Sequence, residues 1–82
     1  MLVNKINTDR MKYDKISLRE REVLHLIAYE YSSKEIAAQL YISTHTVLSH
    51  RKNLLAKLCA KNTAGLIRRA YEENIFSQMI ET

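Results

Sequence analysis

The residues that could carry catalytic or metal chemistry in this sequence are three histidines and one cysteine, and their spacing supports neither. His45 and His50 are five positions apart, so on a helix they point about 140° away from each other and cannot share a metal ion. Cys59 has no second thiol. Ser49 and His50 are adjacent, so their side chains diverge instead of forming a nucleophile and its base. We therefore expect no enzyme activity, no metal site and no cofactor.

The chemistry that remains is hydrogen bonding along residues 44–58, which have helical spacing. At about 100° per residue, one side of such a helix is apolar and is expected to be buried; it carries Val47, Leu54 and Leu58. The opposite side carries His45, Leu48, Ser49, Lys52 and Ala56, and the flank between them carries Thr46, His50, Asn53 and Lys57. Small polar groups with a lysine and no carboxylate suit contact with nucleic acid.

The distribution of charge points the same way. Residues 36–71 contain six Lys and Arg and no acid, whereas residues 1–35 contain seven basic and six acidic residues. Three glutamates in 72–82 bring the net charge to +4. A basic surface attracts phosphate backbones. From charge alone, a solvated helix face whose sign is accidental is an equal alternative.

Composition restricts the fold. A chain of 82 residues forms one domain, and 46% hydrophobic residues exclude a disordered tail. One glycine and no proline argue against a sheet-rich fold. One cysteine excludes an intrachain disulfide framework and suits a reducing compartment, and no apolar run is long enough for a membrane span. We expect a small, basic, all-α domain that acts in the cytoplasm away from the membrane.

Two capping boxes mark the start of the first two predicted helices. Ser17 stands three residues before Glu20, and Ser32 stands three residues before Glu35. Ser43 and Asn62 are single N-cap candidates for two further helices. The helices predicted from these caps and from the apolar spacing cover about 18–30, 33–41, 44–58 and 63–73.

The predicted elements form a compact four-helix domain over residues 16–76, preceded by a flexible arm or linker remnant at 1–15 and followed by a tail at 77–82. The short second helix, a tight turn and the longer third helix have the layout of a helix-turn-helix. In that motif the second of the two helices enters the major groove of DNA.

Several segments in order and register resemble the LuxR/GerE-type DNA-binding domain. The segments that carry this resemblance are residues 16–28, 34–40, 43–51, 57–58 and 62–66. The resemblance implies a bacterial transcription regulator that binds duplex DNA sequence-specifically, with helix 44–58 in the major groove. It also implies an output module of the kind that follows a phospho-receiver or ligand-sensing domain.

The sequence departs from the family at four positions where members usually have glycine. These positions hold Glu30, Tyr41, Cys59 and Asn74. Glycine occupies the left-handed αL region freely and asparagine tolerates it, whereas other residues do so at a cost. Either these residues adopt αL or the turns differ slightly from the family's.

The resemblance also suggests roles for individual residues. Base contacts are expected from Leu48, Ser49 and Lys52, and phosphate contacts from Lys34, Thr44, Thr46, His50, Asn53 and Lys57. A thymine methyl is the apolar target open to Leu48. The alternatives are a solvated Lys34 or Lys52, partial burial of Leu48 beside Leu55, and a His50 that packs against its neighbours.

The last predicted helix is the expected dimer surface, with Ile67 and Tyr71 stacked on one stripe. We expect double-stranded DNA to assemble the homodimer, because one short helix pair buries too little area for a stable interface. Ile67 could instead complete the monomer core. RNA polymerase is a further candidate partner. The alternative function is a small helical protein–protein interaction module whose basic face binds an acidic protein.

Overall fold

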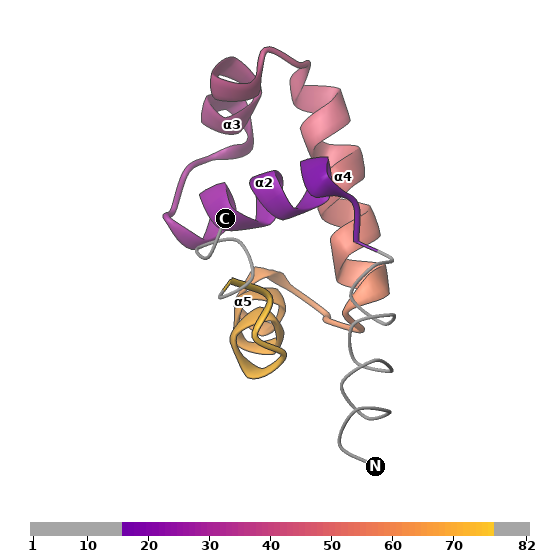
Figure 1. Cartoon of the computed structure of the whole chain (residues 1–82). Helices are drawn as coiled ribbons and strands as arrows, with labels where there is room; N and C mark the ends of the chain where they lie inside the picture. Colours follow the sequence, from indigo (N-terminus) through magenta and orange to yellow (C-terminus); the bar gives the residue numbers. More distant parts are fainter. Residues whose placement is uncertain (1–15, 77–82) are drawn as a thin grey trace.

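The computed structural model describes residues 16–76, and this part of the chain is all-α. Its helices are α2 (Leu18–Ala28), α3 (Ser33–Leu40), α4 (Thr44–Lys57) and α5 (Thr63–Glu72), shown in Figure 1. The prediction of a four-helix domain is confirmed for these residues. The predicted arm at 1–15 and tail at 77–82 lie outside the described residues.

Each helix begins at the cap that the sequence predicts. Ser17, Ser32, Ser43 and Asn62 are N-caps whose side chains accept a hydrogen bond from the backbone N–H three residues on. Both predicted capping boxes form, with the Glu20 and Glu35 side chains accepting from the backbone N–H of Ser17 and Ser32. These contacts satisfy N–H groups that have no partner inside the helix.

The helices end at the four positions where glycine was expected. Glu30, Tyr41, Cys59 and Asn74 all have positive φ, between 55° and 71°, so they adopt αL and the first of the two alternatives holds. An αL residue turns the chain back on the helix, and the N–H of Tyr31 accordingly donates to the Leu26 carbonyl at 3.1 Å. This turn ends each helix one or two residues earlier than predicted.

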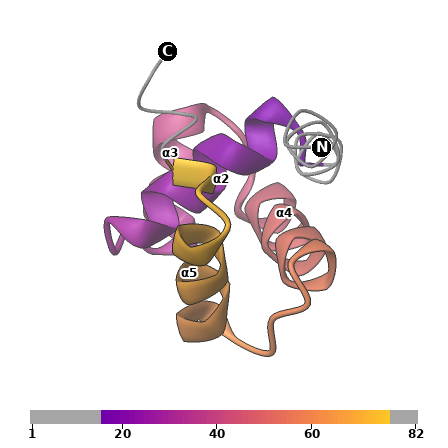
Figure 2. The same cartoon turned by 60° about the horizontal axis from the view of Figure 1, so that its bottom comes forward.

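The helices surround one core, and α4 packs against each of the other three (Figures 1 and 2). In Figure 1, α3 lies beside the N-terminal end of α4, α5 lies toward its C-terminal end, and α2 lies between α3 and α5. The fully buried large side chains are Val23, Leu24, Ile36, Val47, Leu54, Leu66 and Ile75. Tyr31, which follows the αL residue Glu30, is 40% exposed.

No helix within residues 16–76 has the length and apolar character needed to cross a membrane.

Candidate nucleic-acid interface

The third helix of the described chain, α4, is held on its apolar side, as its periodicity predicts. Val47 and Leu54 are fully buried and Leu58, directly after the helix, is nearly so. Side chains half a helical turn away must therefore point outward. The packing of α4 leaves one long polar face open.

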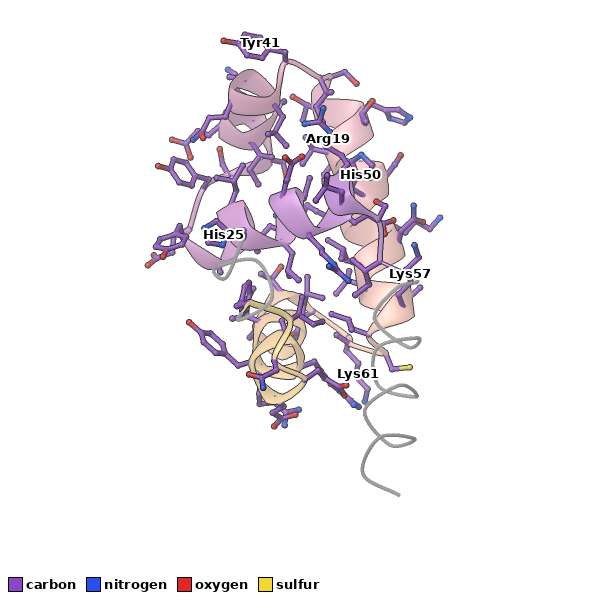
Figure 3. All side chains as sticks on the ribbon, viewed as in Figure 1. Arg19, His25, Tyr41, His50, Lys57 and Lys61 are labelled. Carbon is purple, nitrogen blue, oxygen red and sulfur yellow. The ribbon has the colours of Figure 1, made fainter. Side chains whose placement is uncertain are left out.

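This outward face carries the residues predicted to contact bases. Leu48 is 52% exposed, and Ser49 and Lys52 are exposed beside it, as is His45 toward the N-terminal end. Leu48 therefore has about half of its surface open to a ligand, whereas its neighbour Leu55 is partly buried and packs against the core. Figure 3 shows side chains projecting from α4 away from the other helices. The face combines hydrogen-bonding groups, one cation and one apolar side chain.

The flank of α4 is less uniform than its spacing suggested. Asn53 is exposed, whereas Thr46 and His50 are partly buried. The Thr46 hydroxyl lies 2.8 Å from the Ser43 hydroxyl, within the N-cap of α4. The buried Nδ1 of His50 has no hydrogen-bond partner among residues 16–76. The flank therefore has both outward and inward members.

Two further predicted phosphate contacts lie at helix starts. Lys34 is exposed in the first turn of α3, and Thr44 is exposed as the first residue of α4. Free backbone N–H groups at such ends attract anions. Lys34 thus lies at the N-terminal end of α3, and Thr44 lies at the N-terminal end of α4, directly after the turn.

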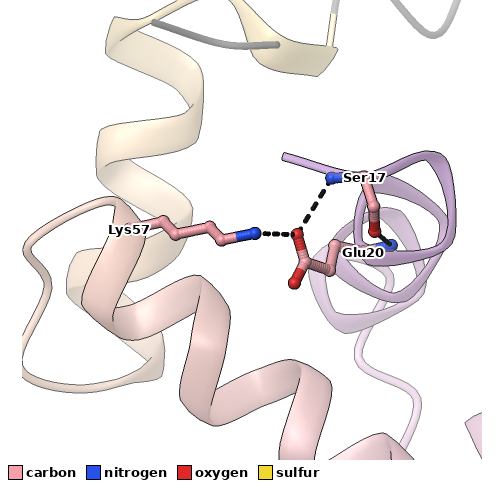
Figure 4. Close-up of polar contacts among 3 residues, drawn as sticks. All are labelled: Ser17, Glu20 and Lys57. Atoms are coloured by element: carbon pink, nitrogen blue, oxygen red, sulfur yellow. Dashed lines mark hydrogen bonds and ion pairs between the residues drawn. The ribbon is translucent and has the colours of Figure 1, made fainter. Parts of the chain in front are cut away.

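Lys57 is the predicted site residue whose surroundings differ most from expectation. Its Nζ donates to Oε1 of Glu20 at 2.8 Å, and the same oxygen accepts from the Ser17 backbone N–H at 2.9 Å (Figure 4). Glu20 is only 4% exposed. Burial by itself raises the pKa of Glu20, but the hydrogen bonds from Lys57 and Ser17 and the nearby charges of Lys57 and His50 outweigh it, so the pKa is lowered.

The sequence analysis missed this ion pair and a second polar contact of α4. A guanidinium nitrogen of Arg51 donates to the Thr63 hydroxyl at 2.9 Å, which connects α4 to the first residue of α5. The capping box with Ser17 already accounted for Glu20 in the sequence, so no further partner was expected for its side chain. Nothing in its spacing from Lys57, 37 residues away, could indicate the ion pair.

The electrostatic character of α4 follows from the acid-free stretch. The carboxylate of Glu20 contacts α4 within the described residues. It is buried, and the ammonium group of Lys57 balances its charge. Lys52 adds positive charge on α4, and the exposed Lys61 adds it in the segment that follows the helix. Among residues 16–76, no three His, Cys, Asp or Glu side chains cluster closely enough to hold a metal ion. The arrangement suits a polyanion.

The predicted dimer residues on α5 have different environments. Ile67 is partly buried and packs against the core, whereas Tyr71 is 68% exposed. The Tyr71 ring lies 4.9 Å from that of Phe76, centroid to centroid. Beside them is a pocket of about 200 Å³, which is also lined by His25 and Tyr29. Tyr71 is thus available to a partner, and Ile67 is shared with the monomer core.

Comparison with known proteins identifies one family. The model for bacterial regulatory proteins of the luxR family matches residues 14–70. The chain is 47% identical over 66 residues to the transcriptional regulatory protein MctR of Rhizobium johnstonii, covering 80% of this chain and 31% of that protein. It is 49% identical over 55 residues to the transcriptional regulatory protein YhcZ of Bacillus subtilis, covering 67% of this chain and 26% of YhcZ.

A third relative is the oxygen regulatory protein NreC of Staphylococcus aureus, 38% identical over 60 residues, or 73% of this chain and 28% of NreC. The chain therefore spans about a quarter to a third of the length of these curated relatives.

Proposed function

The chain belongs to the luxR family of bacterial regulatory proteins, whose domain binds DNA and regulates transcription, and we propose that it binds duplex DNA sequence-specifically with α4 in the major groove. One observation carries this proposal: the outward face of α4 is exposed, mainly polar, and free of carboxylates along its whole length. A helix of this width fits the major groove, where base edges are distinguishable.

Base recognition falls to the centre of the outward face. Lys52 can donate to guanine O6 and N7, and Leu48 can pack on a thymine methyl. Ser49, between them, is small and can donate or accept at a base edge. Because all three are exposed, they can reach base edges without any rearrangement of the core.

The phosphate contacts fix the orientation of α4 on the duplex. We assign them to Lys34 and Thr44 at the starts of α3 and α4, and to the flank. The flank residues in this set are Thr46, His50 and Asn53. Asn53 is exposed, so it reaches a phosphate directly. Lys57, the fourth flank residue, is also exposed, but its ammonium group already binds Glu20.

A homodimer assembled on DNA would double the contacted surface. The α5 surface with Tyr71 exposed and Ile67 partly buried supports this arrangement. One short helix pair falls below the roughly 1,200 Å² of a stable interface, so DNA drives the assembly. RNA polymerase is a further partner in this proposal, which places the protein in the cytoplasm with the DNA.

The experiment that tests the proposal selects bound sequences from random duplexes and then measures two variants. Lys52→Ala should lose about 1–3 kcal/mol on the selected site and much less on random duplex DNA. Lys61→Ala is the matched control, because it removes the same charge from an exposed residue outside α4. It should weaken both DNAs alike.

Two outcomes would contradict the proposal. Equal losses from Lys52→Ala on selected and random DNA would remove Lys52 from base recognition. A chain that selects no sequence and leaves duplex DNA at moderate salt, yet retains an acidic protein, would instead be an interaction module.

A further inference from the structure

An ion pair joins the beginning of α2 to the end of α4. Lys57 is the last residue of α4 and Glu20 is in the first turn of α2, and their charged atoms are 2.8 Å apart. The side chain of Glu20 is 6% exposed and that of Lys57 is 36% exposed. The pair, drawn in Figure 4, therefore joins a buried carboxylate to a partly exposed ammonium group.

Contacts within the α2 capping box orient Glu20 independently of Lys57. The oxygen that accepts the Lys57 ammonium also accepts the Ser17 backbone N–H at 2.9 Å, and the Glu20 backbone N–H donates to the Ser17 hydroxyl at 3.0 Å. The capping box thus holds Glu20 both through its backbone N–H and through one oxygen of its carboxylate. Because the accepting oxygen of Glu20 is fixed, the Lys57 ammonium group must occupy one position to donate its hydrogen bond.

The other contacts of α4 leave its direction less defined. Val47, Leu54 and Leu58 hold the helix through apolar packing, which is not directional. The polar contacts described for the C-terminal half of α4 are the Arg51–Thr63 hydrogen bond, toward α5, and the Lys57–Glu20 pair, toward α2. These two contacts are directional, and they link this half of the helix to α5 and to α2.

We infer that Lys57 is a positioning residue for DNA recognition: through Glu20 it sets the direction of α4, and it does not neutralise a phosphate. This inference rests on the proposed DNA binding. Lys57 lies five residues after Lys52, about 8 Å along the helix axis. A shift at that end therefore tilts the outward face against the groove.

The energetics favour the internal partner over a phosphate. If Lys57 turned to the DNA, it would leave a buried carboxylate without its cation, which is strongly unfavourable. An exposed contact to one phosphate would contribute less free energy than the pair with Glu20, because it forms in a high dielectric and is screened by salt. Lys57 accordingly stays with Glu20 in the complex.

The test compares Lys57→Met, Glu20→Gln and the double variant in the full chain, on the selected site and on random duplex DNA over a series of salt concentrations. Lys57→Met should weaken binding to the selected site about tenfold and leave random DNA and the salt slope nearly unchanged. A lost phosphate contact would instead reduce the slope by about 0.9 and weaken both DNAs equally. That second result would overturn the inference.

Glu20→Gln supplies an independent check, because it retains the lysine charge and an oxygen that can accept from Ser17. If Lys57 positions α4 through Glu20, Glu20→Gln should also lower the affinity for the selected site about tenfold. The double variant should then bind that site no more weakly than either single variant. If Glu20→Gln leaves selected-site affinity unchanged or raises it, the inference is wrong. Lys57→Arg should restore most of the preference, and Lys61→Met is the charge-matched control.

A purely structural role is separated by measuring unfolding of each variant and binding at a temperature where circular dichroism shows it fully folded. If the variants unfold more easily but bind the selected site like the wild-type chain, Lys57 does not position α4 for DNA recognition and the inference is wrong. If the wild-type chain selects no sequence, the proposed function itself fails. If it selects one and the variants retain it, only the role of Lys57 fails.

Discussion

The two capping boxes of this domain have the same sequence pattern and different surroundings. In the α2 box the Glu20 carboxylate accepts from Ser17 at 2.9 Å, and in the α3 box the Glu35 carboxylate accepts from Ser32 at 2.8 Å. The returning bonds to the serine hydroxyls are 3.0 and 3.1 Å. Locally the two boxes are the same structure.

Their tertiary environments separate them. Glu20 is 4% exposed and is paired with Lys57 of α4, whereas Glu35 is exposed to solvent. The pKa of Glu35 is lowered mainly by hydrogen bonds from Ser32, and that of Glu20 by a lysine from another helix as well. One box therefore only starts a helix, and the other also connects two helices.

Replacing each glutamate with glutamine should give the largest difference between the boxes. Glu20→Gln should lower the free energy of unfolding by about 2–3 kcal/mol, less than a fully buried pair would lose because Lys57 can rehydrate. Glu35→Gln should cost much less, because its side chain is already in water. Urea unfolding of both variants measures this. Equal losses would mean that the tertiary ion pair contributes nothing.

Acid should reveal the same difference. Because the folded-state pKa of Glu20 is lowered from 4.5, its contribution to stability is complete above that value and is lost as pH falls through it toward the folded pKa. The Glu20→Gln variant lacks this contribution, so its stability should fall less between about pH 5 and pH 3 than that of the wild-type chain. Parallel urea titrations over this range would show it. Wild-type and variant curves of the same slope would contradict the assignment.

The serine halves of the boxes should behave alike. Ser17→Ala and Ser32→Ala each remove one N-cap acceptor, so each should lower the free energy of unfolding by about 1 kcal/mol. Similar values would place the difference between the boxes in the glutamates. A much larger loss for Ser17→Ala would indicate that the hydroxyl also helps to hold Glu20 against Lys57.

The smallest expected effects are at the other ends of the same helices. Glu30 and Tyr41 are both in αL, and Tyr41 is 94% exposed, so replacing either with glycine sacrifices little packing. Relief of an αL cost of about 1–2 kcal/mol is partly offset by the flexibility of glycine, so each variant should gain about 0.5 kcal/mol. Thermal unfolding should show both transitions shifted upward. A loss at Tyr41 would show that its side chain has a stabilising contact.

The comparison also explains why the site residues on α4 were only partly predictable. Periodicity placed Val47 and Leu54 inside and Leu48 and Lys52 outside, and the structure has them there. Periodicity gave Lys57 and Asn53 the same flank, and both are exposed, yet Lys57 also binds the buried Glu20 of another helix. Helical periodicity defines the direction in which each side chain points around the helix axis. It does not define which residue of another helix lies opposite that side chain.

The amino-acid sequence by itself determined where each helix starts and, to within one or two residues, where it ends, because caps and αL turns depend on residues within one turn of each other. It also determined the sign of the α4 surface, since residues 36–71 contain no acid. The tertiary structure alone decided which of two identical capping boxes is buried and which lysine it binds. Glu20 and Lys57 are 37 residues apart, and only the packing of α2 across α4 brings their charges together, where low solvent exposure strengthens the interaction.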